Sequence, residues 1–127
     1  MHITLRDDKG WVCYLYNDNI HAFSLLKIEQ EKVNTFVSSI QENMLNIQNG
    51  DLIWFISQDA RTSSKYKHSE SLLWRDAGVI LGLFSIVAEA LQLNFCPLGI
   101  TGEPEILSFF DNNSGLSALG GAVLGRK

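Results

Sequence analysis

The chain has 127 residues, of which 46% are hydrophobic and 19% are charged. These proportions predict one folded domain, residues 1–127, with enough apolar residues for a core. The formal net charge of −4 indicates no nucleic-acid surface, because no stripe of Lys and Arg is available to neutralise phosphates. The first ten residues carry charges where a signal peptide needs an apolar core. We therefore expect a cytoplasmic protein.

The longest apolar run without a charge is Ala77–Ala88, which has 12 residues. A helix that crosses a bilayer needs about 20. The sequence therefore predicts no membrane association.

Three short strands are predicted at the start of the chain. Residues 2–6 alternate, residues 11–16 are apolar on both faces, and residues 20–26 follow a polar turn. Aromatic and β-branched residues between tight polar turns are typical of an antiparallel meander.

A helical period begins at about Glu29, because the apolar residues from there recur on one face. They are Val33, Phe36, Val37, Ile40, Met44 and Ile47. Asn49 and Gly50 tolerate the left-handed conformation and are suited to end the helix. Residues 52–57 (LIWFIS) then predict a buried strand.

Residues 69–93 predict a second helix that is apolar on nearly all sides. Such a helix in a soluble protein is expected to be buried on most of its surface. Gly78 and Gly82 form a smooth stripe on which another backbone could lie closely. This stripe has two interpretations, close packing of the helix on a sheet or a helix–helix contact in a dimer.

The remaining elements complete the fold class. Residues 94–99 predict a strand or extended loop, residues 103–110 a short helix and residues 116–124 a last strand. The order of elements predicts an α+β domain with a mainly antiparallel sheet and packed helices. Cys13 and Cys96 both lie among apolar residues, so each is predicted to be a buried free thiol.

Two stretches resemble a known enzyme family. Residues 54–99 read WFISQDARTSSKYKHSESLLWRDAGVILGLFSIVAEALQLNFCPLG, and residues 14–26 read YLYNDNIHAFSLL. They are similar to the second half of nitroreductase-like flavin domains of the SagB/McbC type, which dehydrogenate thiazolines and oxazolines in ribosomal peptides. The resemblance covers roughly residues 11–125 and implies a truncated nitroreductase-like fold. His21 matches a strand histidine of the family and is expected to pack rather than to bind metal, and no metal site is predicted.

The resemblance also implies candidate catalytic residues. In the family a Lys-Tyr pair after an Arg-containing segment is implicated as the acid/base pair of azoline oxidation, and Arg61, Lys65 and Tyr66 stand at the matching positions. Removal of a proton from carbon requires a base whose pKa is tuned by burial or by a neighbouring cation. The alternative is an ordinary solvated loop.

The resemblance implies flavin-contacting residues as well. Pro97, Leu98 and Gly99 match a segment that passes near the flavin ring, and Arg126 stands where family members often place a basic residue near the phosphate. The alternatives are a plain strand end at residues 97–99 and an ordinary basic chain end at residue 126.

The family's Arg-rich RRSxR-type phosphate motif and its PSxGALxPxE-type segment are not found in this sequence. Two lost charge-assisted hydrogen bonds, each of about 1.5–3 kcal/mol, would weaken flavin mononucleotide (FMN) binding roughly a hundredfold or more. We therefore expect no bound cofactor and no catalysis by this chain alone.

Two functional hypotheses follow. The first is a small flavin-free protein-binding protein of antagonist, immunity or regulatory type. The alternative is a subunit of a split FMN-dependent oxidoreductase of the thiazoline/oxazoline dehydrogenase type.

Two surfaces are expected to serve either function. One is the basic loop at residues 61–68, where Arg and Tyr are residue types enriched at binding hot spots. Its predicted partner-binding residues are Arg61, Lys65, Tyr66 and Lys67. The other is the helix segment Ala77–Leu91, through which a homodimer or heteromer is expected to form.

Overall fold

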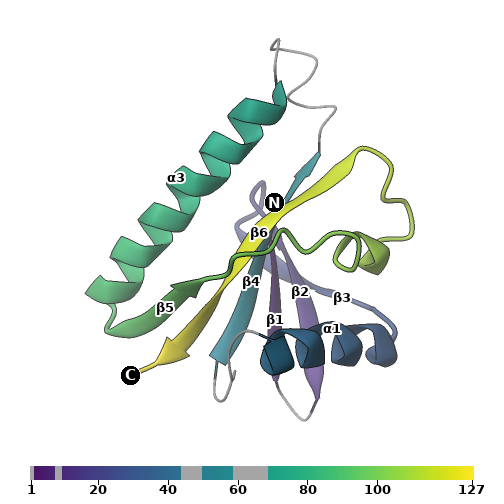
Figure 1. The fold of residues 1–127 in the computed structure, drawn as a ribbon, viewed down its shortest axis with the longest axis horizontal. Helices are drawn as coiled ribbons and strands as arrows, with labels where there is room; N and C mark the ends of the chain where they lie inside the picture. Colours follow the sequence, from purple (N-terminus) through teal and green to yellow (C-terminus); the bar gives the residue numbers. More distant parts are fainter. Residues whose placement is uncertain (1, 8–9, 44–49, 59–68) are drawn as a thin grey trace.

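The computed structural model describes residues 2–7, 10–43, 50–58 and 69–127. In these residues the elements follow the predicted order (Figure 1). They are β1 (His2–Asp7), β2 (Trp11–Asn17), β3 (Ala22–Leu26), α1 (Gln30–Asn43), β4 (Gly50–Gln58), α3 (Ser69–Ala90), β5 (Leu93–Pro97), the 3₁₀ turn η1 (Leu107–Phe109) and β6 (Leu116–Arg126).

The six strands form one sheet in the order β3-β2-β1-β4-β6-β5, and every neighbouring pair is antiparallel. Consecutive strands pair directly in the β1–β3 meander because short turns join them. The prediction of an α+β fold with an antiparallel sheet is confirmed.

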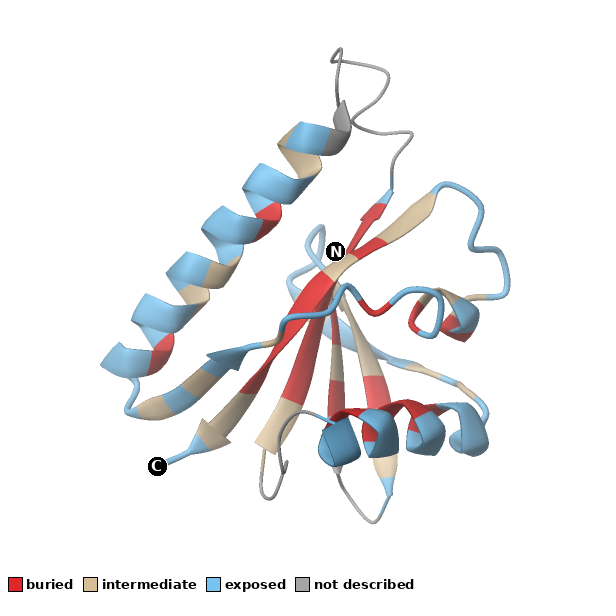
Figure 2. Ribbon diagram, in the orientation of Figure 1, coloured by how far each residue is buried: buried red, intermediate tan, exposed pale blue. Residues whose placement is uncertain are grey.

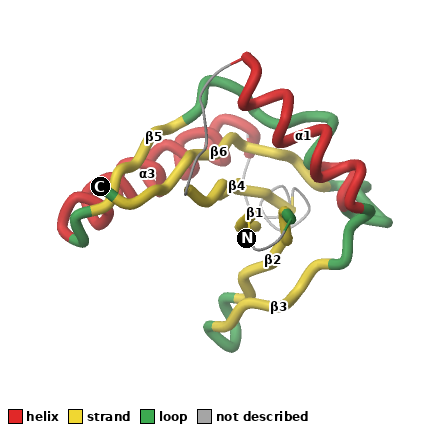
Figure 3. The backbone as a smooth tube through the Cα atoms, turned by 90° about the horizontal axis from the view of Figure 1, so that it is seen from below, coloured by secondary structure: helices red, strands yellow, loops and turns green. Residues whose placement is uncertain are grey.

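The two helices cover opposite faces of the sheet, which Figure 3 shows from the end. Neighbouring side chains of a strand point to opposite faces. On β4, Trp54 contacts Phe36 of α1 at a ring distance of 5.2 Å, whereas the next residue, Phe55, contacts Phe84 of α3 at 5.4 Å. The sheet is thus a boundary between an α1 face and an α3 face.

The main core lies on the α1 face. Helix α1 turns one apolar stripe toward the strands and is exposed elsewhere (Figure 2). Its buried residues are Val33, Phe36, Val37 and Ile40, as the helical period predicted. They pack against the strand residues Ile3, Leu5, Cys13, Leu52, Trp54 and Ile56.

Trp54 is fully buried at the centre of this core. Its indole Nε1 donates a hydrogen bond to the carbonyl of Thr101 at 2.6 Å. Gly121 lies beneath the ring so closely that a Cβ there would overlap both the indole and the carbonyl of Ile53. Only glycine leaves room for this packing.

The third predicted helix, residues 103–110, is shorter than expected. Only the single 3₁₀ turn η1 forms. The hydroxyl of Ser108 donates to the carbonyl of Glu105 at 2.6 Å, a local side-chain bond that competes with regular helix.

The prediction that α3 is buried on most of its surface is wrong. Figure 2 shows the helix largely exposed, and among residues 71–90 only Ala77 and Ala88 are buried. It contacts β5 and β6 with one side alone. The close helix–sheet interpretation of the glycine stripe is also wrong, because open space surrounds Gly78 and Gly82.

The prediction for Cys96 is corrected, whereas His21, which was predicted to pack, contacts the ring of Tyr16 at a centroid distance of 5.7 Å from an exposed position. Cys96 is exposed rather than buried, because it lies on the edge strand β5 and points away from α3, whereas its neighbour Phe95 contacts Phe84. His21 is exposed in the turn before β3 with a positive φ of 50°. Its Nδ1 shares a hydrogen bond of 2.5 Å with the hydroxyl of Tyr16.

Candidate functional site

The predicted catalytic and partner-binding residues of the basic loop fall in residues 59–68. Arg61, Lys65, Tyr66 and Lys67 therefore lie outside the described part of the chain. The structure tests neither their role as an acid/base pair nor their role as a binding surface.

The residues predicted to approach a flavin ring form the end of β5 and the turn after it. Pro97 is the last residue of β5 and lies opposite Ala122 of β6. The amide of Leu98 donates to the carbonyl of Gly121 at 2.9 Å. Gly99 is exposed, with open space where a Cβ would stand. The turn is thus tied to β6 at Leu98 and open at Gly99.

Arg126 lies at the other end of the same ladder. It pairs with Leu93, four register positions from the pair of Pro97 and Ala122. Four positions along a strand span roughly 13 Å. The structure therefore does not bring Arg126 next to the turn at residues 97–99.

Arg126 contributes instead to a small charged group on the α3 face. Burial raises the pKa of the Asp51 carboxyl, and the cations Arg6 and Arg126 partly oppose this effect. The Nε of Arg6 lies 3.5 Å from an Asp51 carboxylate oxygen. The net raised pKa shows that loss of water outweighs the two cations here.

The α3 face of the sheet is only partly covered. Helix α3 lies over β5 and β6, while no helix of the described residues lies on the same side of β1, β2 and β3 in Figures 1 and 3. We call this second area the open face. It presents the side chains Thr4, Tyr14, Tyr16, Phe23 and Leu25.

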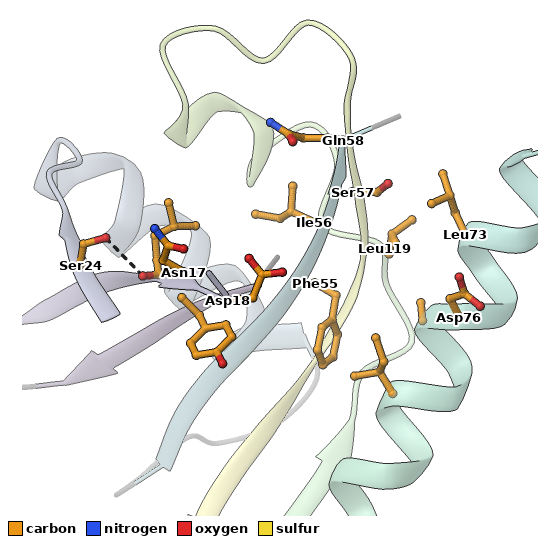
Figure 4. A pocket seen from close by; sticks show the side chains of 14 residues that line it. Asn17, Asp18, Ser24, Phe55, Ile56, Ser57, Gln58, Leu73, Asp76 and Leu119 are labelled. Atoms are coloured by element: carbon orange, nitrogen blue, oxygen red, sulfur yellow. Dashed lines mark hydrogen bonds between the residues drawn. The ribbon is translucent and has the colours of Figure 1, made fainter. Parts of the chain in front are cut away.

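Two cavities lie between α3 and the open face. One, of about 480 Å³, has Tyr14 and Phe23 on the sheet side and Phe84 on the helix side. The other, of about 390 Å³, is drawn in Figure 4. Asp18 from the β2–β3 turn and Asp76 from α3 line this cavity from its two ends, and β4 passes between them in Figure 4. Together the cavities form a trough, with α3 as its wall and the open face as its floor.

Among the described residues, most of the exposed large apolar side chains belong to α3. Seven large apolar side chains of this helix and the residue after it are 38–69% exposed, and they are Trp74, Val79, Ile80, Leu83, Ile86, Val87 and Leu91. By length and composition alone, Ser71–Ala90 would suffice to cross a membrane. One such helix is weak evidence, because the mostly buried core helix of a soluble protein passes the same test, although this window is only 11% buried. The finding therefore assigns no location.

The exposed surface of α3 is what sequence reasoning missed. The signal was present, since a helix apolar on every side cannot be covered by a sheet on one side alone.

Among the described residues, no three His, Cys, Asp or Glu side chains gather as metal ligands.

No protein-family model matches this sequence, and no curated protein matches it either.

Proposed function

We propose that this protein is a small protein-binding protein of antagonist, immunity or regulatory type, built on a nitroreductase-like scaffold, and that α3 is its docking element. We define the outer face of α3 as Val79, Leu83, Ile86 and Val87. These side chains are 54–69% exposed although they are as apolar as the core. This single observation carries the proposal.

The helix geometry separates the outer face from the face that holds α3 on the sheet. At 100° per residue, Ala77, Phe84 and Ala88 share one side of the helix, and all three are buried or half-buried. Leu83 and Ile86 point away from that side. The fold of the chain therefore uses one side of α3 and leaves a second apolar side for another molecule.

The exposed apolar area is large enough for a binding surface. The outer face, together with Phe23 and Leu25 of the open face, presents about 350 Å² of apolar surface, if a fully exposed side chain offers about 100 Å². Patches larger than a few hundred Å² usually mark interaction sites. Burial at about 25 cal/mol per Å² would yield about 9 kcal/mol, which lies within the range of about 4–15 kcal/mol that association costs.

The alternative, a subunit of a split FMN-dependent oxidoreductase, depends on Lys65 and Tyr66, which lie outside the described residues. Two of the residues assigned to the flavin have other interactions. The amide of Leu98 donates a hydrogen bond to the carbonyl of Gly121, and the charge of Arg126 opposes the rise in the pKa of Asp51. The hydrogen bond of Leu98 and the electrostatic effect of Arg126 on Asp51 support a protein that works without flavin. A purified protein with a bound-flavin absorption spectrum would reverse the preference.

The test is partner recovery with two matched variants. Tagged chain is expressed in its own cells beside an untagged copy, and the proteins recovered in stoichiometric amount are quantified. Leu83→Glu places a charge in the outer face, whereas Ile20→Glu places the same charge at an exposed apolar residue of the β2–β3 turn. We expect the first variant to lose the partner and the second to keep it. Equal recovery with both variants, each shown to be folded, would contradict the proposal.

A further inference from the structure

We propose that the larger cavity of the trough, of about 480 Å³, binds a free α-amino acid with an apolar or aromatic side chain. The carboxylate of this ligand would lie on Arg6 and its ammonium group on Asp51. Its side chain would lie among the rings of Tyr14, Phe23 and Phe84, which line the same cavity. This inference goes beyond the proposed docking role of α3 and does not rest on it.

The charged end of the cavity is a loose ion pair. The Nε of Arg6 lies 3.5 Å from an Asp51 carboxylate oxygen, and the two side chains are 60% and 30% exposed. In the described part of the chain neither side chain makes a hydrogen bond. A guanidinium group has five N–H donors, and a carboxylate has about four acceptor sites. Both groups therefore keep the capacity to bind a ligand.

Two adjacent opposite charges favour a ligand that carries two adjacent opposite charges as well. A ligand with a cation alone would lie beside the Arg6 guanidinium, and a ligand with an anion alone would lie beside the Asp51 carboxylate. In each case a like charge of the protein repels it. An α-amino acid carries its ammonium and carboxylate groups on one carbon atom, so both groups can meet their opposite charge at once.

The Asp51 carboxylate also lacks full compensation of its charge in the absence of a ligand. Burial raises the pKa of this carboxyl, although the cations Arg6 and Arg126 oppose the rise. An ammonium group at hydrogen-bonding distance favours the charged form of a carboxylate more strongly than a distant cation does. Asp51 is therefore suited to receive the ammonium group of the ligand.

The apolar end of the cavity is already in place before a ligand binds. The ring of Phe84 lies 5.4 Å from that of Phe55 and 6.5 Å from that of Phe95. The ring of Phe23 lies 5.5 Å from that of Tyr16. Walls that are held by such contacts lose little side-chain freedom on binding. Sites for small ligands typically have volumes of about 300–1,000 Å³, with an apolar lining and a few polar groups, and this cavity has both properties.

Three probes that share a phenyl group test the recognition of the two charges. L-Phenylalanine has both charges, phenethylamine has the ammonium group alone, and hydrocinnamate has the carboxylate alone. Titration calorimetry with the full chain at neutral pH measures the three affinities. We expect L-phenylalanine to bind about tenfold or more tightly than either analogue, because this is the contribution of one charge-assisted hydrogen bond. Glycine has both charges and no side chain, and it should bind more weakly than L-phenylalanine by a similar factor.

Single substitutions at the ion pair should switch the preference for the probes. Asp51→Asn leaves the cation of Arg6, so this variant should bind hydrocinnamate about tenfold more tightly than phenethylamine. Arg6→Gln leaves the carboxylate of Asp51 and should show the opposite preference. Misfolding would lower the affinity for both analogues and cannot produce a switch. Asp111→Asn is the matched control, because it removes an exposed carboxylate outside the cavity, and it should bind L-phenylalanine within about twofold of the wild type.

Two results would overturn this proposal. The first is that neither L-phenylalanine nor L-leucine binds the wild-type chain at up to about 10 mM. The second is that the three phenyl probes bind equally, since an apolar cavity without charge recognition would do the same. Neither result affects the recovery of a protein partner with the Leu83→Glu variant, so the amino-acid site and the docking role of α3 can fail separately.

Discussion

The two faces of the sheet differ in how completely the chain covers its own apolar surface. On the α1 face, the helix has one apolar stripe, and that stripe is buried from Val33 to Ile40. On the α3 face, the helix is apolar all round, and its second side stays exposed. One sheet can bury a single apolar stripe of a helix, whereas a second stripe is buried only by another surface. The α1 face therefore holds the main core of the fold, and the α3 face is the part that the proposed function assigns to recognition.

The largest expected contrast between the faces comes from one truncation on each. Phe36→Ala removes a ring that contacts both Trp54 and Phe109, and it should cost about 3–5 kcal/mol of unfolding free energy. Leu83→Ala removes an exposed side chain and should change it by less than about 0.5 kcal/mol. Urea unfolding measures both. Similar losses at the two positions would contradict the division of roles.

The second contrast compares glycines. Gly121→Ala forces a methyl group into the indole of Trp54 and the carbonyl of Ile53, and overpacking of this kind costs about 2–3 kcal/mol. We expect thermal unfolding to show a clearly lower midpoint. A midpoint equal to that of the wild type would mean that Trp54 is not held as closely as the structure places it.

The third comparison concerns Gly82, whose replacement by alanine should raise the free energy of unfolding rather than lower it. Gly82→Ala adds a methyl group to a helix position with open space around it, so it should raise stability by about 0.5–1 kcal/mol through the lower freedom of the unfolded chain. The measurement is again urea unfolding. A destabilised variant would show that another part of the chain lies against Gly82, contrary to the open space in the structure.

The same difference explains how much the sequence could predict. Helix α1 and strand β4 were predicted because each pattern indicates one kind of element. A one-sided apolar stripe indicates a helix with one buried face, and a short apolar run indicates a buried strand. The exposure of α3 was not predicted. Apolar residues indicate that a helix surface is to be buried, but they do not indicate whether the same chain or another molecule buries it. Cys96 was predicted wrongly for a related reason, since an apolar neighbourhood does not reveal that a strand lies at the edge of the sheet. Of the candidate site, the positions of Pro97–Gly99 and Arg126 on one ladder depend on the register of β5 and β6, which local pattern does not give.

The smallest effect concerns the charge beneath α3. Folding raises the pKa of Asp51 above its ordinary value of 3.8, with burial as the main cause and Arg6 and Arg126 in opposition. Between the ordinary and the raised pKa the folded state holds more protons than the unfolded state, so stability falls as the pH rises through this interval and stays lower above it. Asp51→Asn removes this penalty. The variant should be more stable than the wild type at about pH 7, and the difference should shrink at about pH 3, where the carboxyl is protonated in both states. Urea unfolding at the two pH values checks this. A variant that is less stable at neutral pH would show that the ion pair with Arg6 outweighs burial, and that the trough beside α3 favours a charged carboxylate.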